Sequence, residues 1–403
     1  MNTGPKIAIV VSHPIQHFCP QYVSFAQNKN CSVKVFFGSA LGYKKYVDIN
    51  FKQEISWSNL HLDKFNHIFL NGDAVIQADK QLDAATLEME LAAFQPDLVI
   101  VYGYFQRLQR RAYKWATKNK VPIAYISDSE LRQQRNSLKE FIKSIFLRRY
   151  FSKISYFLSV GNANEAFYKK YRVSNEKIVR MHFPIDINQY RAAYAEKKLL
   201  RNKIRNQYGI GEKEIVVSVV GKLSAWKNQD HLIDAIQLLE TKSIYLNALI
   251  LGSGQMKTMW EQKAKHLKIS KVYFPGFVDI GELPGYYAAS DLYVHPASVE
   301  PHSIAVSEAI YMGCPVILSD RCGSYGDEDD VQPGKNGYTF EFGNIKQLAE
   351  RISVLINDHG QRNYFGENSH KIAVNFQANA HHIVLEKLIG NLNKGGAHQR
   401  PDK

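Results

Sequence analysis

Two glutamates eight positions apart carry the clearest chemical signal in this chain. Glu300 follows the apolar run DLYVH and the short loop PASV, and Glu308 lies in the helical pattern SIAVSEAIYM, which Gly313 closes. Carboxylates bind sugar hydroxyls well, because each oxygen accepts charge-assisted hydrogen bonds. The backbone N–H groups of Ser303 and Ile304 are expected to begin the helix, and a helix N-terminus favours a phosphate. Spacing by itself fits two ordinary helix-flanking glutamates even better.

A second signal is the segment GKLSAWKN, which begins at Gly221 directly after a β-branched run. It holds Lys222 and Lys227, five positions apart at the end of an expected strand. Two cations there can neutralise a diphosphate whose negative charge grows as a bond breaks. Exposed lysines with no ligand are, by themselves, the more common explanation of such a pair.

The segment LGSG, which ends at Gly254, is a third signal at the end of a strand. It is not the GxGxxG fingerprint of a dinucleotide site, because position 257 is lysine. It fits a tight turn near a nucleotide and an ordinary loop about equally.

Two loops in the first half also lie directly after expected strands. SHPIQHF contains His17, which can orient a sugar or shuttle a proton, although a loop histidine is often merely polar. SDSE contains Asp128, which can stabilise a developing cation or simply cap a helix.

The elements that must position these residues alternate between short β-branched runs and helical patterns. This alternation predicts an α/β protein with parallel sheets covered by helices on both faces. The pattern restarts near 213, which predicts two doubly wound domains, 1–195 and 196–380, with ligands bound in a cleft between the carboxyl ends of their sheets. We expect the tail 394–403 to be disordered. The expected strands are Ile7–Val11, Val33–Phe37, Leu98–Tyr102, Pro122–Ile126, Phe157–Val160, Ile215–Val220, Leu246–Leu251, Val272–Phe274, Leu292–His295 and Pro315–Leu318.

Charge is distributed unevenly along the 403 residues. The formal net charge is +13, and residues 1–200 carry 29 basic and 16 acidic side chains, which accounts for all of it. An excess of basic residues confined to one half of the chain suggests an anionic partner: nucleic acid, a membrane surface or a phosphorylated substrate. A solvated basic face is the alternative. In 131–157, apolar and basic residues alternate at helical spacing, which favours a helix on an anionic membrane over nucleic acid, for which no motif is present.

Other features exclude several classes of protein. Four cysteines in so long a chain, none in a CxxC pair, indicate neither a disulfide framework nor a zinc site. The acidic run Asp327–Asp330 has no second cluster of ligands and is expected to be a solvated loop, so we predict no metal. No signal peptide or run long enough to span a membrane is found. We therefore expect a cytoplasmic protein, peripheral to the inner face of a membrane if 131–157 binds lipid.

Together these motifs resemble the family 4 glycosyltransferases, retaining enzymes with the two-domain GT-B fold. The resemblance is specific over 215–345, where the Glu-x7-Glu pair, GKLSAWKN, LILGSG, VYFPGFV and GKNGYTF occur in the family's order. It is looser in the first half. It implies that the last helix, about 380–393, packs back on the first domain.

The resemblance also implies roles for individual residues. Glu300 would contact the donor sugar, Glu308 the ribose of the nucleotide, and Lys222 and Lys227 the diphosphate. The amides of Ser303 and Ile304 would hold the sugar or phosphate. Lys222 stands where the family usually has arginine, so it keeps the charge without the bidentate fork. Ser303 replaces a common glycine, and the family's histidine near 127–128 is missing, so its role falls to Asp128 or His17 or is absent.

The function implied is transfer of a sugar from a nucleotide-sugar donor to an acceptor hydroxyl with retention, as in polysaccharide or glycolipid assembly. The enzyme would be a metal-independent hexosyltransferase that needs no cofactor beyond its donor. A lipid-linked or sugar acceptor is expected. The alternatives are a sugar-nucleotide epimerase of the same fold, a non-catalytic relative and a basic nucleic-acid-binding protein.

Overall fold

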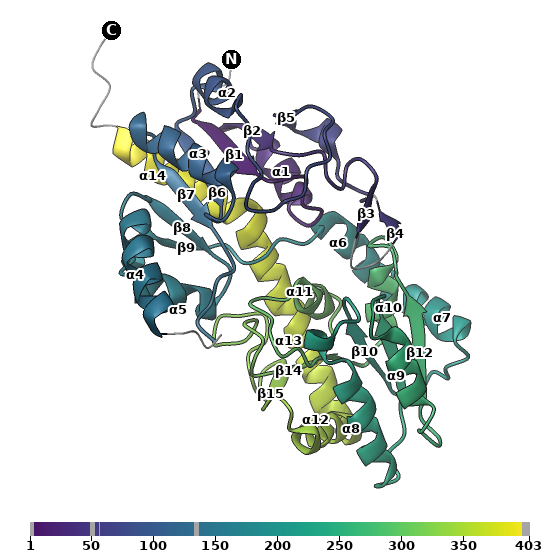
Figure 1. The fold of residues 1–403 in the computed structure, drawn as a ribbon. Helices are drawn as coiled ribbons and strands as arrows, with labels where there is room; N and C mark the ends of the chain where they lie inside the picture. Colours follow the sequence, from purple (N-terminus) through teal and green to yellow (C-terminus); the bar gives the residue numbers. More distant parts are fainter. Residues whose placement is uncertain (1–3, 49–52, 56, 133–136, 397–403) are drawn as a thin grey trace. The chain divides into compact units, whose positions relative to one another are not determined.

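Two α/β units make up the computed structural model, which describes residues 4–48, 53–55, 57–132 and 137–396 (Figure 1). The first unit comprises Met1–Val160, Asn164–Asp186 and Gln377–Lys403, and the second comprises Gly161–Ala163 and Ile187–Phe376. In the described residues, each unit has a parallel sheet with helices packed on both faces. The predicted α/β class with two doubly wound domains is therefore confirmed.

The described residues of the first unit form a seven-stranded parallel sheet. In sheet order its strands are β5 (Asn66–Phe69), β2 (Ser32–Phe37), β1 (Lys6–Val11), β6 (Leu98–Tyr102), β7 (Ile123–Ile126), β8 (Tyr156–Ser159) and β9 (Ile178–Arg180). A short antiparallel hairpin, β3 (Tyr46–Asp48) and β4 (Gln53–Ile55), lies outside this sheet. The helices of the unit are α1 (Cys19–Ala26), α2 (Leu87–Phe94), α3 (Arg107–Lys118), α4 (Ser137–Phe151), α5 (Asn162–Lys170) and α14 (Val384–Gly396).

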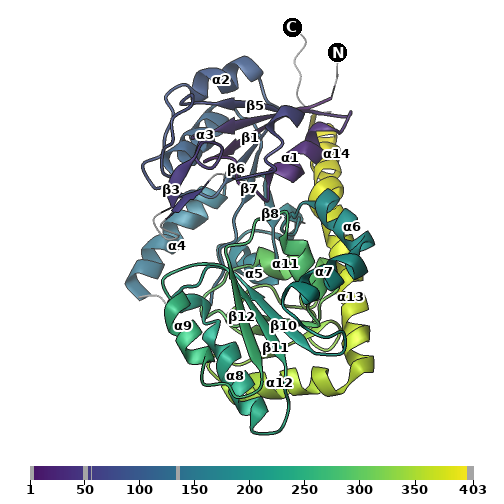
Figure 2. The ribbon, with the colours of Figure 1, turned by 90° about the vertical axis from the view of Figure 1, so that its right-hand side faces the viewer.

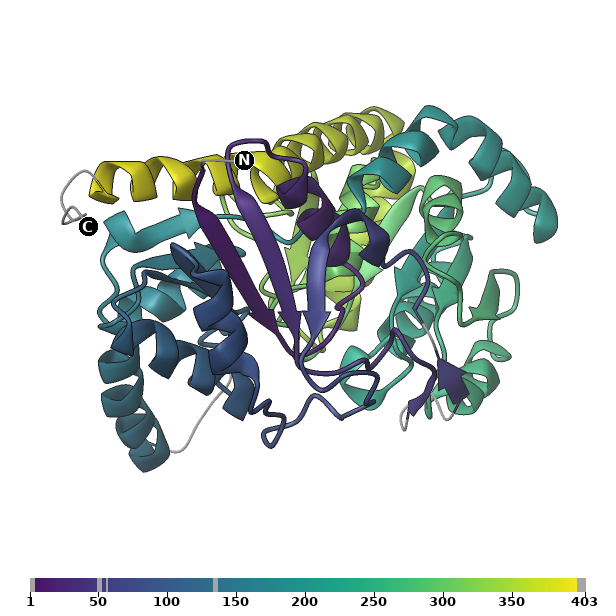
Figure 3. The ribbon, with the colours of Figure 1, turned by 90° about the horizontal axis from the view of Figure 1, so that it is seen from above.

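Each face of the first sheet has its own apolar core, because alternate residues of a strand point to opposite faces. Ile7 and Ile9 of β1 face a core completed by α1 and α14, whereas Ala8 and Val10 face one completed by α2, α3, α4 and α5. Figure 3 shows the C-terminal helix running along one face of the sheet and α3 and α4 on the other. Strands buried on both faces explain the nearly continuous apolar runs in the sequence.

The described residues of the second unit form a six-stranded parallel sheet. In sheet order its strands are β12 (Lys271–Gly276), β11 (Asn247–Leu251), β10 (Val216–Val220), β13 (Leu292–His295), β14 (Val316–Ser319) and β15 (Gly337–Phe340). Its helices are α6 (Ile187–Ala195), α7 (Lys197–Gln207), α8 (Asp230–Glu240), α9 (Lys257–Ala264), α10 (Leu283–Ala289), α11 (Ile304–Tyr311), α12 (Ile345–Asn357) and α13 (His359–Ala378), the last of which ends in the first unit.

The helices of the second unit also cover both faces of its sheet. Val217 and Val219 of β10 face a core with α8, α9 and α12, and Val216 faces one with α7 and α10. Figure 2 shows α8 and α9 on one side of β10–β12 and α7 on the other. The chain order of the strands, 3-2-1-4-5-6, reverses direction between β10 and β13, which is where ligands of such folds bind.

The boundary between the units lies earlier than the expected 195/196. The second unit begins at Ile187, because α6 and α7 pack on α10 and not on the first sheet. The chain then returns to the first unit at Gln377, and α14 contributes buried side chains to the core beside α1. Of the expected tail 394–403, residues 394–396 are the end of α14, and the rest lie outside the described residues.

No helix in the described parts of the chain combines the length and the apolar character that a membrane crossing requires.

The return of α14 to the first unit predicts a measurable stability contribution. Leu388 is fully buried against the first sheet, so Leu388→Ala should lower the free energy of unfolding by about 2–5 kcal/mol through lost burial and a residual cavity. Chemical denaturation followed by circular dichroism measures this. Glu386→Ala, an exposed change on the same helix, is the control. Equal effects of the two variants would contradict the packing described here.

Candidate active site

The sequence-predicted donor residues come together at the carboxyl edge of the second sheet. Gly221 and Lys222 follow β10, Gly254 follows its neighbour β11, and Glu300 follows β13 on the other side of β10. Parallel strands end at the same edge, so loops far apart in sequence become neighbours there. The sheet order thus assembles the motifs that the sequence leaves separate.

The glycines of the LGSG segment allow two of these loops to touch. A Cβ on Gly252 would lie 2.0 Å from the carbonyl oxygen of Gly221, and a Cβ on Gly254 would lie 2.3 Å from that of Leu223. Both glycines have positive φ, 130° and 157°, which L side chains rarely adopt. Hydrogen bonds of 3.0 Å from the amides of Gly221 and Leu223 join the same loops. Gly254 is therefore required for close backbone packing.

Glu300 is held between two cationic or hydrogen-bonding side chains. Lys227 donates to its Oε2 in an ion pair, and Nε2 of His295 lies 3.2 Å from the same oxygen. Ser298 anchors the 3-10 turn that carries Lys227, because its amide donates to the carbonyl of Trp226 at 2.9 Å. The sequence placed Lys227 on the diphosphate and Glu300 on the sugar, and the structure shows the two in contact.

The electrostatics of this cluster follow from its burial. Burial by itself raises the pKa of Glu300, but the hydrogen bond with His295 and the charge of Lys227 outweigh it and lower that pKa to about 2. Burial lowers the pKa of His295, against the opposing effect of Glu300. At neutral pH, Glu300 is therefore a carboxylate, and a neutral His295 donates to it through Nε2, since a carboxylate can only accept. The cluster is a fixed negative charge beside a lysine.

Helix α11 begins at Ile304, as the sequence predicts, with Ser303 as its N-cap residue. The amide of Ser303 donates to Oγ of Ser324 at 2.8 Å, in a pair of buried residues. Of the two amides predicted to hold the donor, that of Ser303 thus already has a partner within the chain. The role of the Ile304 amide stays a prediction.

A buried polar cluster supports the start of α11. Nε2 of His302 lies 3.1 Å from Oδ2 of Asp330, and Ser307 donates to the same oxygen at 2.6 Å. The expectation of a solvated acidic loop is wrong for half of 327–330: Asp330 and Asp329 are buried, and Asp329 accepts from the amide of Asn162 at 2.9 Å. These carboxylates face into the protein because amide, hydroxyl and imidazole donors are available there.

Glu308 lies one turn after Ile304 on α11 and is almost completely buried, with 4% of its surface exposed. Tyr287 of α10 donates to its Oε2 at 2.8 Å. Burial raises the pKa of Glu308 to about 7, although hydrogen bonds from Tyr287 and Tyr190 act in the opposite direction. The carboxyl group therefore exists in both protonation states near neutral pH.

His17 and Asp128 belong to the first unit, and both follow strands at the carboxyl edge of its sheet. His17 packs on the rings of Phe18 and Phe183, with centroids 4.6 and 5.6 Å apart. Burial, followed by the nearby His13, lowers the pKa of His17 to about 3, so it is neutral and a weak base at pH 7. Asp128 is exposed after β7.

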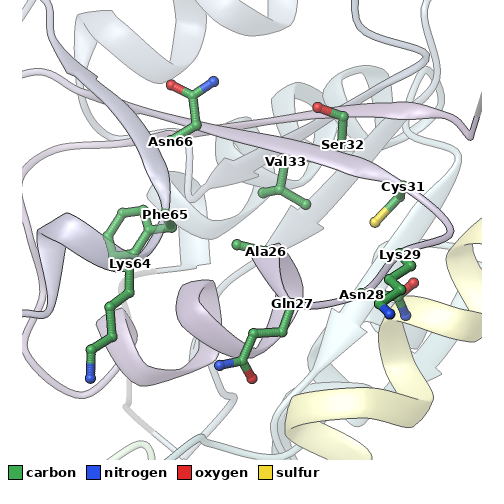
Figure 4. Close-up of a pocket in the computed structure, with 10 residues that line it drawn as sticks. All are labelled: Ala26, Gln27, Asn28, Lys29, Cys31, Ser32, Val33, Lys64, Phe65 and Asn66. Carbon is green, nitrogen blue, oxygen red and sulfur yellow. The ribbon is translucent and has the colours of Figure 1, made fainter. Parts of the chain in front are cut away.

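Two further features of the described residues are a pocket away from the predicted residues and the state of the cysteines. A pocket of about 620 Å³ in the first unit lies at the opposite, amino edge of the sheet, beside the starts of β2 and β5, and contains none of the predicted residues (Figure 4). None of the four cysteines forms a disulfide, and all four are buried. Among the residues that the structure describes, no group of three or more histidine, cysteine or acidic side chains could hold a metal ion.

Sequence reasoning missed His295, Tyr287 and the His302–Asp330 pair. His295 had a signal, since it is a polar residue at the end of an apolar strand five positions before Glu300. The others had none, because their partners are 21 and 28 positions away and only the tertiary fold brings them together.

The burial of Glu308 predicts a pH-dependent stability. Its pKa is about 7 in the folded chain against a usual 4.5, so the penalty for ionising it is absent below pH 4.5, grows between 4.5 and 7, and is complete above 7. Glu308→Gln removes this penalty, worth about 3 kcal/mol. We expect the variant to unfold at higher denaturant than the wild type at pH 8 and at nearly equal denaturant at pH 4.5. The exposed Glu367→Gln is the control, and a gain independent of pH would contradict the burial of an ionising group.

The second unit matches a known protein family. Residues 201–372 match the model of the glycosyl transferases group 1 family, a region that contains Lys222, Lys227, Glu300 and Glu308. Spore coat protein SA of Bacillus subtilis (strain 168) is 27% identical over 214 residues, which are 50% of this chain and 55% of that protein. The chain spans about half the length of the curated relatives it matches.

Solved structures resemble the chain over nearly its whole length. A glycosyltransferase from Rickettsia africae ESF-5 superimposes with a TM-score of 0.71 at 15% identity, covering 98% of this chain and 100% of that one. Anabaena Alr3699/HepE, crystallised in complex with UDP-glucose, superimposes with a TM-score of 0.66 at 19% identity, covering 97% and 100%. Identity this low establishes the fold alone. Residues 201–372 thus match the model of the glycosyl transferases group 1 family, within a chain that has the two-domain GT-B fold.

Proposed function

We propose that this protein is a retaining glycosyltransferase that moves a hexosyl group from a nucleotide-sugar donor to an acceptor hydroxyl, in polysaccharide or glycolipid assembly. The observation that carries the proposal is the partly buried cluster of Lys227, Glu300 and His295 beside the N-terminus of α11. It places a cation, a fixed carboxylate and a helix N-terminus at the sheet edge where such folds bind ligands. The match of 201–372 to the model of a glycosyltransferase family supports the same conclusion.

In the proposed mechanism, the cations stabilise the donor diphosphate. As the bond from the anomeric carbon to the phosphate oxygen breaks, that oxygen gains negative charge, and positive charge nearby lowers the barrier. We assign this role to Lys222, Lys227 and the N-terminus of α11. Because Lys227 already contacts Glu300, a bound diphosphate would share its ammonium group with the carboxylate.

In the same mechanism, the two glutamates bind the donor sugar and the ribose. Glu300 accepts hydrogen bonds from sugar hydroxyls and stays ionised, because its pKa is about 2. Glu308 accepts from the ribose hydroxyls. The acceptor oxygen attacks the anomeric carbon from the face that the diphosphate leaves, and its proton passes to a donor phosphate oxygen. One carbon–oxygen bond forms as another breaks, and because both bonds lie on the same face of the anomeric carbon, the configuration is retained.

We propose no metal and no cofactor beyond the donor, because the lysines supply the charge that a metal would otherwise supply. The acceptor side is assigned to the first unit. In that unit His17 has a pKa of about 3, which suits hydrogen bonding to a sugar better than proton transfer. We assign contact with the acceptor to the carboxylate of the exposed Asp128. We propose a sugar or lipid-linked acceptor, no nucleic-acid partner, and a cytoplasmic location that is peripheral to the membrane.

Replacing Lys227 tests the diphosphate assignment. Lys227→Ala should lower kcat/KM for sugar transfer by about 10²–10³-fold, because a preorganised charge at the leaving group is lost. Binding of the nucleoside diphosphate should weaken in isothermal titration, while circular dichroism should report an unchanged fold. Lys371→Ala, on α13 and 71% exposed, is the matched control. Full activity of Lys227→Ala would remove the assignment.

A thermal-shift panel of nucleoside diphosphates and nucleotide sugars identifies the donor. A ligand at about 100 times its dissociation constant should stabilise the folded state by about 2.7 kcal/mol. The donor found in this way is then incubated with the protein, first alone and then with acceptors. Transfer that requires an acceptor supports the proposal. Conversion of the donor sugar without any acceptor would establish an epimerase, and stabilisation by no nucleotide would exclude the donor site.

A further inference from the structure

Helix α4 presents large apolar side chains to solvent. Leu147, Tyr150 and Phe151 are buried against the first sheet. On the other side of the helix lie four exposed apolar residues, with exposed fractions of 64% for Phe141, 61% for Ile142, 57% for Ile145 and 46% for Phe146. The outward side of a helix in a globular protein is normally polar. An apolar outward side that covers positions i, i+1, i+4 and i+5 is a single stripe, which indicates that something covers it.

Basic side chains surround this stripe. Arg148 and Arg149 are exposed in the last turn of α4. Helix α3 lies beside α4, since Tyr113 donates to the carbonyl of Tyr150 at 3.0 Å and their rings stack 4.1 Å apart. Both helices cover the same face of the first sheet, so their outward sides lie on one side of the unit. Figure 1 shows α4 at the outer side of the sheet, beside α5.

The outward side of α3 is basic. Arg107, Arg110 and Lys114 are spaced three or four positions apart and lie opposite the buried Leu108 and Ala112. Leaving out residues 137–139, α3 and α4 contain eight lysines and arginines and one acidic residue, Glu140, and Arg111 among the eight pairs with Asp83 and Glu88. Glu140 already accepts hydrogen bonds from Tyr171 and Lys170. The surface is therefore strongly cationic around its apolar stripe.

We propose that the outward surface of α3 and α4 docks on an anionic lipid bilayer. Phe141, Ile142, Ile145 and Phe146 enter the boundary between headgroups and acyl chains, and the arginines and lysines pair with lipid phosphates. Apolar side chains flanked by cations with long apolar stems fit a bilayer, because the stems follow the apolar region while the charges stay at the headgroups. Acidic lipids supply the charge complement. Of the predicted segment 131–157, residues 133–136 and the side chains of 137–139 lie outside the described residues and take no part in this argument.

This docking surface does not depend on the proposed sugar transfer, since it shares no residue with the donor site. The two proposals can therefore fail separately. Vesicle binding is measured without donor or acceptor, and donor binding by thermal shift is measured without lipid.

The test is co-sedimentation of the purified chain with vesicles. The vesicles contain phosphatidylcholine alone or phosphatidylcholine with about 30% phosphatidylglycerol, and each is tested at about 0.05 M and about 0.5 M salt. The higher salt concentration shortens the Debye length several-fold. We expect binding to the anionic vesicles at low salt and at least about tenfold weaker binding to the neutral ones. No binding to anionic vesicles at low salt would overturn the proposal.

Two variants separate the apolar and the charged contributions. Phe141→Ser with Ile145→Ser should weaken binding to anionic vesicles at least about tenfold. Arg148→Glu with Arg149→Glu should abolish the preference for anionic lipid. The matched controls lie in the second unit: Leu199→Ser on α7, 65% exposed, and Lys371→Glu on α13, 71% exposed. All replaced side chains are exposed, so circular dichroism and thermal unfolding should match the wild type.

Other outcomes would assign the surface to a different occupant. If the α4 variants bind vesicles like the wild type, the lipid site lies elsewhere and the proposal is wrong. If light scattering shows that the wild-type chain is a dimer and that Phe141→Ser with Ile145→Ser makes it a monomer, the stripe is an interface between copies, which also overturns it.

Discussion

A partly buried carboxylate keeps its charge only where that charge is compensated, and the contacts of Glu300 in the second unit meet this requirement. Burial opposes its ionisation, and Lys227 and His295 reverse the balance so far that its pKa is about 2. Lys227 comes from the turn after β10 and His295 from the end of β13. The neighbouring strands β10 and β13 must therefore be in register for the cluster to exist, so the sheet and the site are specified by the same contacts.

Glu308, on helix α11, shows the opposite solution. Two tyrosines donate hydrogen bonds to it, no cation among the described residues pairs with it, and burial raises its pKa to about 7. Two carboxylates eight positions apart are therefore held in different states by their surroundings, one permanently charged and one able to exchange a proton near neutral pH. The unfavourable burial of Glu308 is the kind of cost that proteins retain where a polar group serves a ligand.

The two units use the same architecture for different surfaces. Both cover a parallel sheet with helices on each face, yet the basic excess of the chain belongs to its first 200 residues. In the second unit Lys222 and Lys227 lie at the carboxyl edge of the sheet, where folds of this kind bind ligands. In the first, charge and apolar side chains spread over the outward sides of α3 and α4, which suits a broad anionic surface.

The sequence alone determined the fold class, the ten strands it predicted and the sheet edge at which the residues predicted to bind the donor lie. Buried parallel strands are visible in the sequence as apolar runs, and the glycines, lysines and acidic residues that follow these runs mark the ends of the strands. It missed the hairpin strands β3 and β4 and also β5, β9 and β15, all of which are three or four residues long. The last three form sheet edges, where the apolar signal is weak. Only the tertiary structure decided the partners of Glu300, the burial of Asp329 and Asp330 and the packing role of Gly254. Each depends on which distant segments meet, and local spacing carries no information about that.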